Sequence, residues 1–75
     1  MDQGYEYIER HIARNTVEFY VRTSQGHRVV RIILDGKDPR VQAHNESSGK
    51  RSPALLFMSE LERLIKRAKN LTGVK

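Results

Sequence analysis

The chain has 75 residues, of which 37% are hydrophobic and none is cysteine. Residues 1–75 are expected to form one small domain with a thin core, which excludes a multi-domain enzyme, a Rossmann or barrel scaffold and an array of repeats. Lysine plus arginine number 14 against 9 for aspartate plus glutamate, a net charge of +5, so a polyanion, most often nucleic acid, is the expected partner.

The sequence predicts neither a membrane protein nor a secreted one. No apolar run approaches the roughly 18 residues that a membrane span requires. The first six residues are polar and acidic, unlike a signal peptide. The lack of cysteine excludes disulfides and thiolate metal sites and favours a reducing compartment, the cytoplasm or the nucleoid. A small domain without such crosslinks often completes its core by association, so we expect a homodimer.

Residues 5–14 fit two periodicities. Ile8 and Ile12 are four residues apart, as on one face of a helix, whereas the alternation of side chains fits a strand. We favour a strand, because a helix would bury little beyond these two isoleucines. A short turn at Asn15 is expected to follow.

Residues 16–35 carry the clearest signal, that of a β-hairpin. Apolar and polar side chains alternate over residues 16–23, and residues 28–35 are rich in β-branched side chains. Gly26, which can adopt a positive φ, marks the turn between the two strands. The apolar face of the first strand carries Val17, Phe19 and Val21.

The second strand of this hairpin has an apolar set and a mixed set of side chains. The apolar set, expected to pack against the core, comprises Val30, Ile32 and Leu34. The mixed set comprises Val29, Arg31 and Ile33, and it shares the other face with Tyr20 and Arg22. An alternative for this second face is that another subunit buries Val29 and Ile33.

Two loops flank a short fourth strand. Residues 35–39 contain Asp-Gly and Pro, which interrupt regular structure, and residues 40–44 form the short strand. Residues 45–53 are predicted to be a flexible basic loop. Lys50 and Arg51 within it either follow a phosphate backbone or are simply solvated.

A helix closes the chain. Ser59 and Glu62 fit a capping box, in which each side chain accepts a hydrogen bond from a backbone N–H. Gly73 is the expected stop signal, and residues 54–58 form either a buried strand or an extra helical turn. The apolar stripe of the helix comprises Leu61, Leu64, Ile65, Ala68 and Leu71. The predicted fold is α+β: a curved antiparallel sheet of about four strands followed by one C-terminal helix (ββββα).

Catalysis is poorly supported by the sequence. His11, His27 and His44 are widely spaced and lack a carboxylate or cysteine partner in a ligand motif, so no metal site is expected. Neither a nucleophile elbow nor a complete phosphate-binding loop is present. We therefore expect a protein that is not an enzyme and that uses no cofactor or small-molecule substrate.

The hairpin and the basic loop carry the binding signal. Tyr20 shares an exposed face with Arg22 and Arg31, which suits single-stranded nucleic acid because aromatic and guanidinium planes stack on bases while cations hold phosphates. Lys50 and Arg51 are expected to add phosphate contacts. These five residues form the predicted site, and the cations of the helix are interpreted as ordinary solvent-facing charges.

The chain resembles two related groups of proteins. The segments that resemble the second and third strands of a Pur-alpha repeat are residues 19–22, Gly26 and residues 28–32. Residues 52–61 match the last strand and helix start, and together with Gly49-Lys50 they resemble the positive-cofactor type of transcriptional coactivator. The resemblance spans residues 8–70 and departs at 35–46, which is longer than a plain hairpin.

This resemblance implies a Whirly-like ββββα fold whose two copies associate and bind single-stranded DNA or RNA on curved sheets, as in regulators of transcription or replication. By position, Tyr20, Arg22 and Arg31 would lie on the sheet, and Lys50 and Arg51 in the basic loop. Two other classes remain open. One is a small protein-interaction module, such as a phage or bacterial regulator that docks on a host protein, and the other is a duplex-DNA-binding sheet domain.

Overall fold

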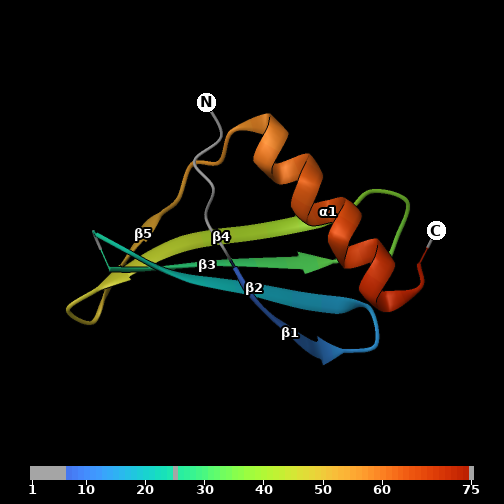
Figure 1. Ribbon diagram of the computed structural model, residues 1–75, viewed down its shortest axis with the longest axis horizontal. Coiled ribbons are helices and arrows are strands. Elements are labelled where there is room, and N and C mark those ends of the chain that lie inside the picture. Colours follow the sequence, from blue (N-terminus) through green and yellow to red (C-terminus); the bar gives the residue numbers. More distant parts are fainter. Residues whose placement is uncertain (1–6, 25, 75) are drawn as a thin grey trace.

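The computed structural model describes residues 7–24 and 26–74 of the chain. Within them, five antiparallel strands form one sheet in the spatial order β1-β2-β3-β4-β5, and a single helix lies across one face (Figure 1). The elements are β1 (Ile8–Ala13), β2 (Thr16–Thr23), β3 (Gly26–Ile33), β4 (Arg40–Ser47), β5 (Lys50–Pro53) and α1 (Met58–Thr72). The α+β fold with a C-terminal helix is therefore confirmed, with five strands instead of about four. No helix among the described residues is long and apolar enough to cross a membrane.

The predicted hairpin is confirmed as β2 and β3. Val17 lies opposite Ile32 and Phe19 opposite Val30, which puts the expected apolar sets on one face. The turn depends on Gly26, whose φ is +117°. A Cβ added to Gly26 would lie 2.2 Å from the carbonyl oxygen of Glu46 in β4, so this position excludes any side chain.

The strand interpretation of the N-terminal segment is confirmed for Ile8–Ala13, while residues 5 and 6 lie outside the described residues. β1 pairs with β2 and occupies one edge of the sheet, with a register shift between His11 and Ala13. All of its residues are exposed.

The prediction of a loop over residues 45–53 is wrong. β4 continues to Ser47, and the chain then turns back through Ser48 and Gly49 into β5. Both turn residues have positive φ, +52° and +76°, which matches the twist of a tight β-hairpin. An edge strand is held by its backbone hydrogen bonds and needs no apolar side chains, so a polar composition did not exclude one here.

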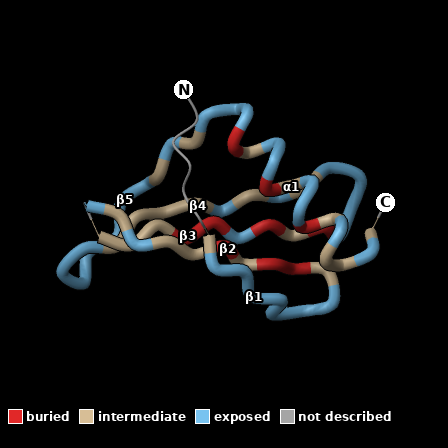
Figure 2. Tube along the Cα trace, in the orientation of Figure 1, coloured by how far each residue is buried: buried red, intermediate tan, exposed pale blue. Residues whose placement is uncertain are grey.

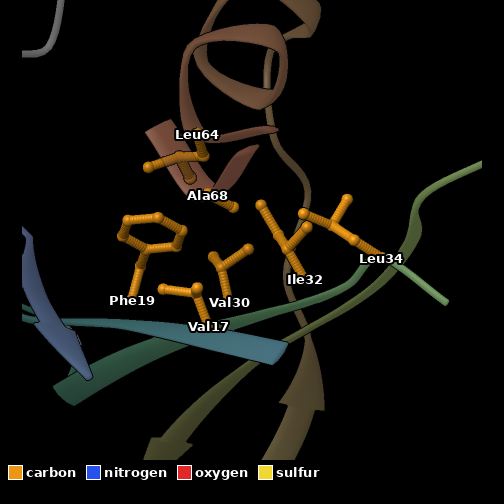
Figure 3. Packing of buried hydrophobic residues seen from close by; sticks show 7 residues of the cluster. All are labelled: Val17, Phe19, Val30, Ile32, Leu34, Leu64 and Ala68. Atoms are coloured by element: carbon orange, nitrogen blue, oxygen red, sulfur yellow. The ribbon is translucent and has the colours of Figure 1, made fainter. Parts of the chain in front are cut away.

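The core lies between the sheet and α1. Val17, Phe19, Val30 and Ile32 are almost completely buried in β2 and β3. Figure 3 shows these side chains pointing toward the helix, where the facing cluster is completed by Leu34, Leu64 and Ala68. Figure 2 shows that the buried residues concentrate in the first half of β2, in the second half of β3 and at spaced positions along α1. Four members of the apolar stripe predicted for the helix, Leu64, Ile65, Ala68 and Leu71, therefore belong to or pack against the core, whereas Glu60 and not Leu61 is buried in the first turn.

The predicted helix start is wrong. α1 begins at Met58 after an extended N-cap residue, Phe57, which makes no side-chain cap hydrogen bond, and Ser59 lies inside the first turn. The backbone N–H of Leu61 donates to the carbonyl oxygen of Phe57 at 3.0 Å, so the helical ladder starts before Ser59. The predicted stop is confirmed: Gly73 is left-handed, with φ of +76°, and its N–H donates to the carbonyl oxygen of Lys69.

Residues 54–57 are neither a buried strand nor a helical turn. Leu56 packs partly against the core, whereas its neighbours point into solvent. The exposed fractions are 90% for Leu55, 72% for Phe57 and 69% for Met58. Leu55, Phe57 and Met58 are together called the apolar connection below. They are the three most exposed large hydrophobic side chains among the described residues.

Candidate nucleic-acid interface

The face of the sheet that α1 does not cover, called the outer face below, is organised in rows that run across the strands. Directly opposite residues of antiparallel strands project to the same face. The pairings of all five strands place one central row on the outer face, formed by Ile8, Tyr20, Val29, His44 and Pro53. This central row offers aliphatic and aromatic surface across the full width of the sheet.

Tyr20 is the aromatic centre of the outer face. Its ring lies 5.0 Å from the ring of His27, measured between centroids, with an angle of 43° between the planes. Both residues are half-buried, so part of each ring remains accessible. Val29, opposite Tyr20, is only 9% exposed in the single chain, so no second subunit is needed to bury it.

Charged rows flank the central row on both sides. On one side Arg31 donates to Glu18 at 3.0 Å, and Arg10 lies 3.9 Å from the same carboxylate. On the other side the Nε of Arg51 donates to Glu46 at 3.2 Å. Arg22 also lies in this second row, because it is opposite His27, and His27 is opposite Glu46.

Arg22 differs from the other outer-face arginines. It is exposed, and none of the described residues forms an ion pair or side-chain hydrogen bond with it. Arg31, in contrast, forms an ion pair with Glu18, and Arg51 forms one with Glu46. A phosphate can therefore contact Arg22 without first displacing an internal partner.

The structure brings four of the five predicted site residues to the outer face. Tyr20, Arg22 and Arg31 lie on β2 and β3, and Arg51 joins them from β5, opposite Glu46. Lys50 lies opposite Ser47 and projects to the other face of the same hairpin. Consecutive strand residues alternate between faces, so the adjacent cations of the supposed loop are separated.

Sequence reasoning missed several members of this surface. His44 entered no predicted site because the register of β4 against β3 could not be read from one strand, and the length of β4 was underestimated. Ile8 and Arg10 were missed because the pairing of β1 with β2 was unknown. The alternation of residues 40–47 was the available signal, since it puts His44 and Glu46 on the face of Gln42.

On the other face, a polar cluster fastens the start of α1 to the sheet. Glu60 is 9% exposed and lies 3.7 Å from Arg28 of β3. The Nε of Arg28 also donates to the Oδ1 of Asn45 at 3.4 Å. Burial and the nearby Glu60 carboxylate raise the pKa of Tyr7, which keeps its hydroxyl protonated. These contacts are structural, because the groups are enclosed between two elements.

A second clamp connects α1 to β1. The Nε of Arg67 donates to the Oε1 of Glu9 at 2.5 Å, and the Nη2 of Arg67 donates to the Oε2 at 2.9 Å. The hydrogen bond from Arg67 lowers the pKa of the Glu9 carboxyl. Arg67 is therefore tied to the sheet edge although it is exposed, whereas the equally exposed Lys66 forms no ion pair with a described residue.

Comparison with protein-family models, with curated proteins and with solved structures finds no match to this chain. The resemblance to Pur-alpha repeats and positive-cofactor coactivators thus stays a prediction. In the described ranges, no three histidine, aspartate or glutamate side chains gather in a geometry that could hold a metal ion.

Proposed function

We propose that this protein binds single-stranded nucleic acid on its outer face and is not an enzyme. The observation that carries the proposal is the central row of aliphatic and aromatic side chains between two arginine-bearing rows. Bases stack or pack on the central row, and phosphates meet the arginines beside it. Of these cations, Arg22 is the principal phosphate contact.

The same arrangement favours single strands over duplexes. In a duplex the base faces are stacked on one another, so the exposed part of Tyr20 and the row around it would find no planar partner. A single strand presents both unstacked bases and phosphates. DNA and RNA both fit this chemistry, and contacts to the 2′-hydroxyl would distinguish them.

The proposal includes a homodimer in the cytoplasm or nucleoid that regulates transcription or replication. Association would give two outer faces and therefore a larger footprint on the strand. Light scattering at micromolar protein concentration measures the mass directly. A monomer that still binds single strands would remove the dimer and leave the binding site in place.

The function is tested by fluorescence anisotropy with a labelled DNA single strand, an RNA of the same sequence and the corresponding DNA duplex, each at two salt concentrations. We expect either single strand to bind more tightly than the duplex, with affinity falling as salt rises. The Arg22→Ala variant should flatten the salt dependence for single strands by a slope of about 0.7, the value of one phosphate contact.

Lys66→Ala is the matched control, because it removes one exposed positive charge from the opposite side of the molecule. A second control compares Arg51→Ala with Lys50→Ala, since these neighbours project to opposite faces of one hairpin. Only the Arg51 variant should weaken binding. Tighter binding of the duplex, or a larger loss from Lys66→Ala than from Arg22→Ala, would contradict the proposal.

Docking on another protein is a second candidate function, favoured by the apolar connection. Three large hydrophobic side chains within four residues are unusually exposed there. If none of the three nucleic acids binds with salt-dependent affinity, this candidate replaces the first. Phe57→Ser should then reduce partner capture, while Tyr20→Ala should leave it unchanged.

A further inference from the structure

Two of the three histidines of the chain lie on the outer face. His27 belongs to β3 and lies opposite Arg22, and His44 belongs to β4 and lies opposite Val29. The third, His11 of β1, lies opposite the core residue Val17 and so projects to the face that α1 covers. The histidines are therefore unevenly divided between the two faces.

The surroundings of His27 come from three strands. On β2 its ring contacts Tyr20 at 5.0 Å between centroids, and Arg22 is its cross-strand neighbour. On β4 its cross-strand neighbour is Glu46. His27 is half-buried and lies on the face of the sheet opposite α1 (Figure 1), so part of its surface remains open to solvent.

His44 has the same carboxylate as a neighbour. Its Nε2 lies 3.3 Å from the Oε1 of Glu46, and its cross-strand neighbours are Val29 on β3 and Pro53 on β5. The Oε1 of Glu46 also accepts a hydrogen bond from Arg51 at 3.2 Å. One carboxylate thus contacts one permanent cation and the His44 imidazole, and His27 is its cross-strand neighbour.

This sharing decides the charge of the region at different pH values. With both imidazoles neutral, Arg22 and Arg51 lie in one row with a single carboxylate, Glu46, so the region is already positive. With both imidazoles protonated, the same carboxylate is outnumbered by four positive groups and cannot neutralise them. The surplus positive charge then lies beside Tyr20, where the proposed site meets the phosphates of a bound strand.

We infer that His27 and His44 make the binding of single-stranded nucleic acid pH-dependent, as additional phosphate contacts that operate only when protonated. This inference rests on the proposed function. It adds a regulation that the arginines cannot supply, because a guanidinium stays charged throughout this range. The other members of the central row, with Tyr20 among them, continue to hold the bases at every pH, so protonation changes the strength of binding and leaves its location unchanged.

The expected effect is a gain in affinity on acidification. Two new exposed charge contacts should tighten binding roughly fivefold between about pH 8 and about pH 5.5. They should also steepen the dependence of the logarithm of affinity on the logarithm of salt concentration by up to about 1.4, which is two contacts of about 0.7 each.

The test uses the full chain and a fluorescein-labelled oligothymidylate of about 15 nucleotides, long enough to cover one site. Anisotropy titrations at both pH values compare the wild type with His27→Gln, His44→Gln and the double variant. His11→Gln is the matched control, since it removes the remaining histidine from the other face. Circular dichroism of each variant at both pH values verifies that the fold persists.

Loss of most of the pH effect in the double variant, together with its retention in His11→Gln, would support the inference. A full pH effect in a folded double variant would overturn it while leaving the proposed function standing. Absence of binding at both pH values would overturn both.

A second measurement does not depend on substitution. Calorimetry of the wild type near about pH 6.5 in two buffers with different ionisation enthalpies counts the protons taken up when the oligonucleotide binds. Net uptake is expected, and no uptake would contradict the inference.

Discussion

The two faces of the sheet are built from the same strands and differ in what covers them. On the helix side, Phe19 and its neighbours pack against α1 and exclude water. On the outer face, Tyr20 and its neighbours keep part of their surface open. Phe19 and Tyr20 are adjacent in sequence. Because side chains alternate along β2, Phe19 contributes to the core and Tyr20 to the outer face.

Ion pairs show the same difference. Arg28 and Glu60 on the helix side are 18% and 9% exposed, whereas on the outer face Glu18 is 14% exposed and its partner Arg31 is 45% exposed. A pair enclosed between two elements holds them together, and its loss leaves a buried charge. A pair open to water contributes little to folding and can exchange its partner for a ligand. Predictions follow from this contrast.

The largest effect is expected from Phe19→Ala. This residue is 1% exposed and fills the space under α1, so its truncation should destabilise the fold by about 3–5 kcal/mol. Urea unfolding measures the loss. A cost near zero would show that α1 does not pack on this face in solution.

Glu60→Gln should destabilise the fold by about 2 kcal/mol, because Arg28 would keep its charge in a half-buried place and lose the attraction of the Glu60 carboxylate. Glu18→Gln is the matched change on the outer face. It should cost less than about 1 kcal/mol of stability and should strengthen nucleic-acid binding, since Arg10 and Arg31 then lose their shared acceptor. Equal losses of unfolding free energy in Glu60→Gln and Glu18→Gln would show that the buried and the open pair contribute equally to stability.

Tyr20→Ala should act on affinity. The loss of one stacking platform should weaken single-strand binding by about 1–3 kcal/mol, as measured by anisotropy. Phe57→Ala is a suitable control, because it removes an exposed aromatic ring away from the outer face. If Tyr20→Ala binds single strands as tightly as the wild type, the binding site does not lie on the central row.

A smaller effect is expected from the clamp between Glu9 and Arg67. The pKa of Glu9 is lowered by Arg67 from its ordinary value of 4.5. Its contribution to stability is therefore fully present above pH 4.5 and is lost as the pH falls through the lowered value. Urea unfolding of the wild type and of Glu9→Gln should differ at neutral pH and converge in acid, and Glu62→Gln serves as the control for an exposed helix carboxylate.

The smallest effect is expected from Ser59→Ala. Because Ser59 is exposed within the first helical turn and Phe57 occupies the N-cap, the substitution should change the unfolding free energy by less than about 0.5 kcal/mol. A true N-cap serine would cost about 1 kcal/mol. A loss of that size would indicate that the helix starts at Ser59 after all.

The features that were predictable from the sequence depend on local periodicity. The patterns of residues 16–23 and 28–35 correctly placed Val30 and Ile32 in the core and Arg31 on the other face, since a period of two fixes the face of every residue once one residue of the strand is placed. The position of Gly73 ended α1 as expected, because a left-handed residue stops a helix by itself.

The features that were missed depend on pairing between segments. β5 is polar and is a strand only because the backbone of β4 lies beside it, so composition alone suggested a loop. The separation of Lys50 from Arg51 follows from that pairing. Met58 starts α1 because the extended Phe57 provides the N-cap through its backbone, which a search for capping side chains does not detect.

The contact between Gly26 and the backbone of Glu46 also determines where the chain tolerates engineering. A residue or label added beside Gly26 would disturb this close approach, so a tag or fluorescent label does not belong in the turn between β2 and β3. The turn between β4 and β5 is different, because a Cβ on Gly49 would meet nothing within 4 Å. A short insertion between Ser48 and Gly49 is therefore the favoured place for a reporter, at the edge of the surface that it would report on.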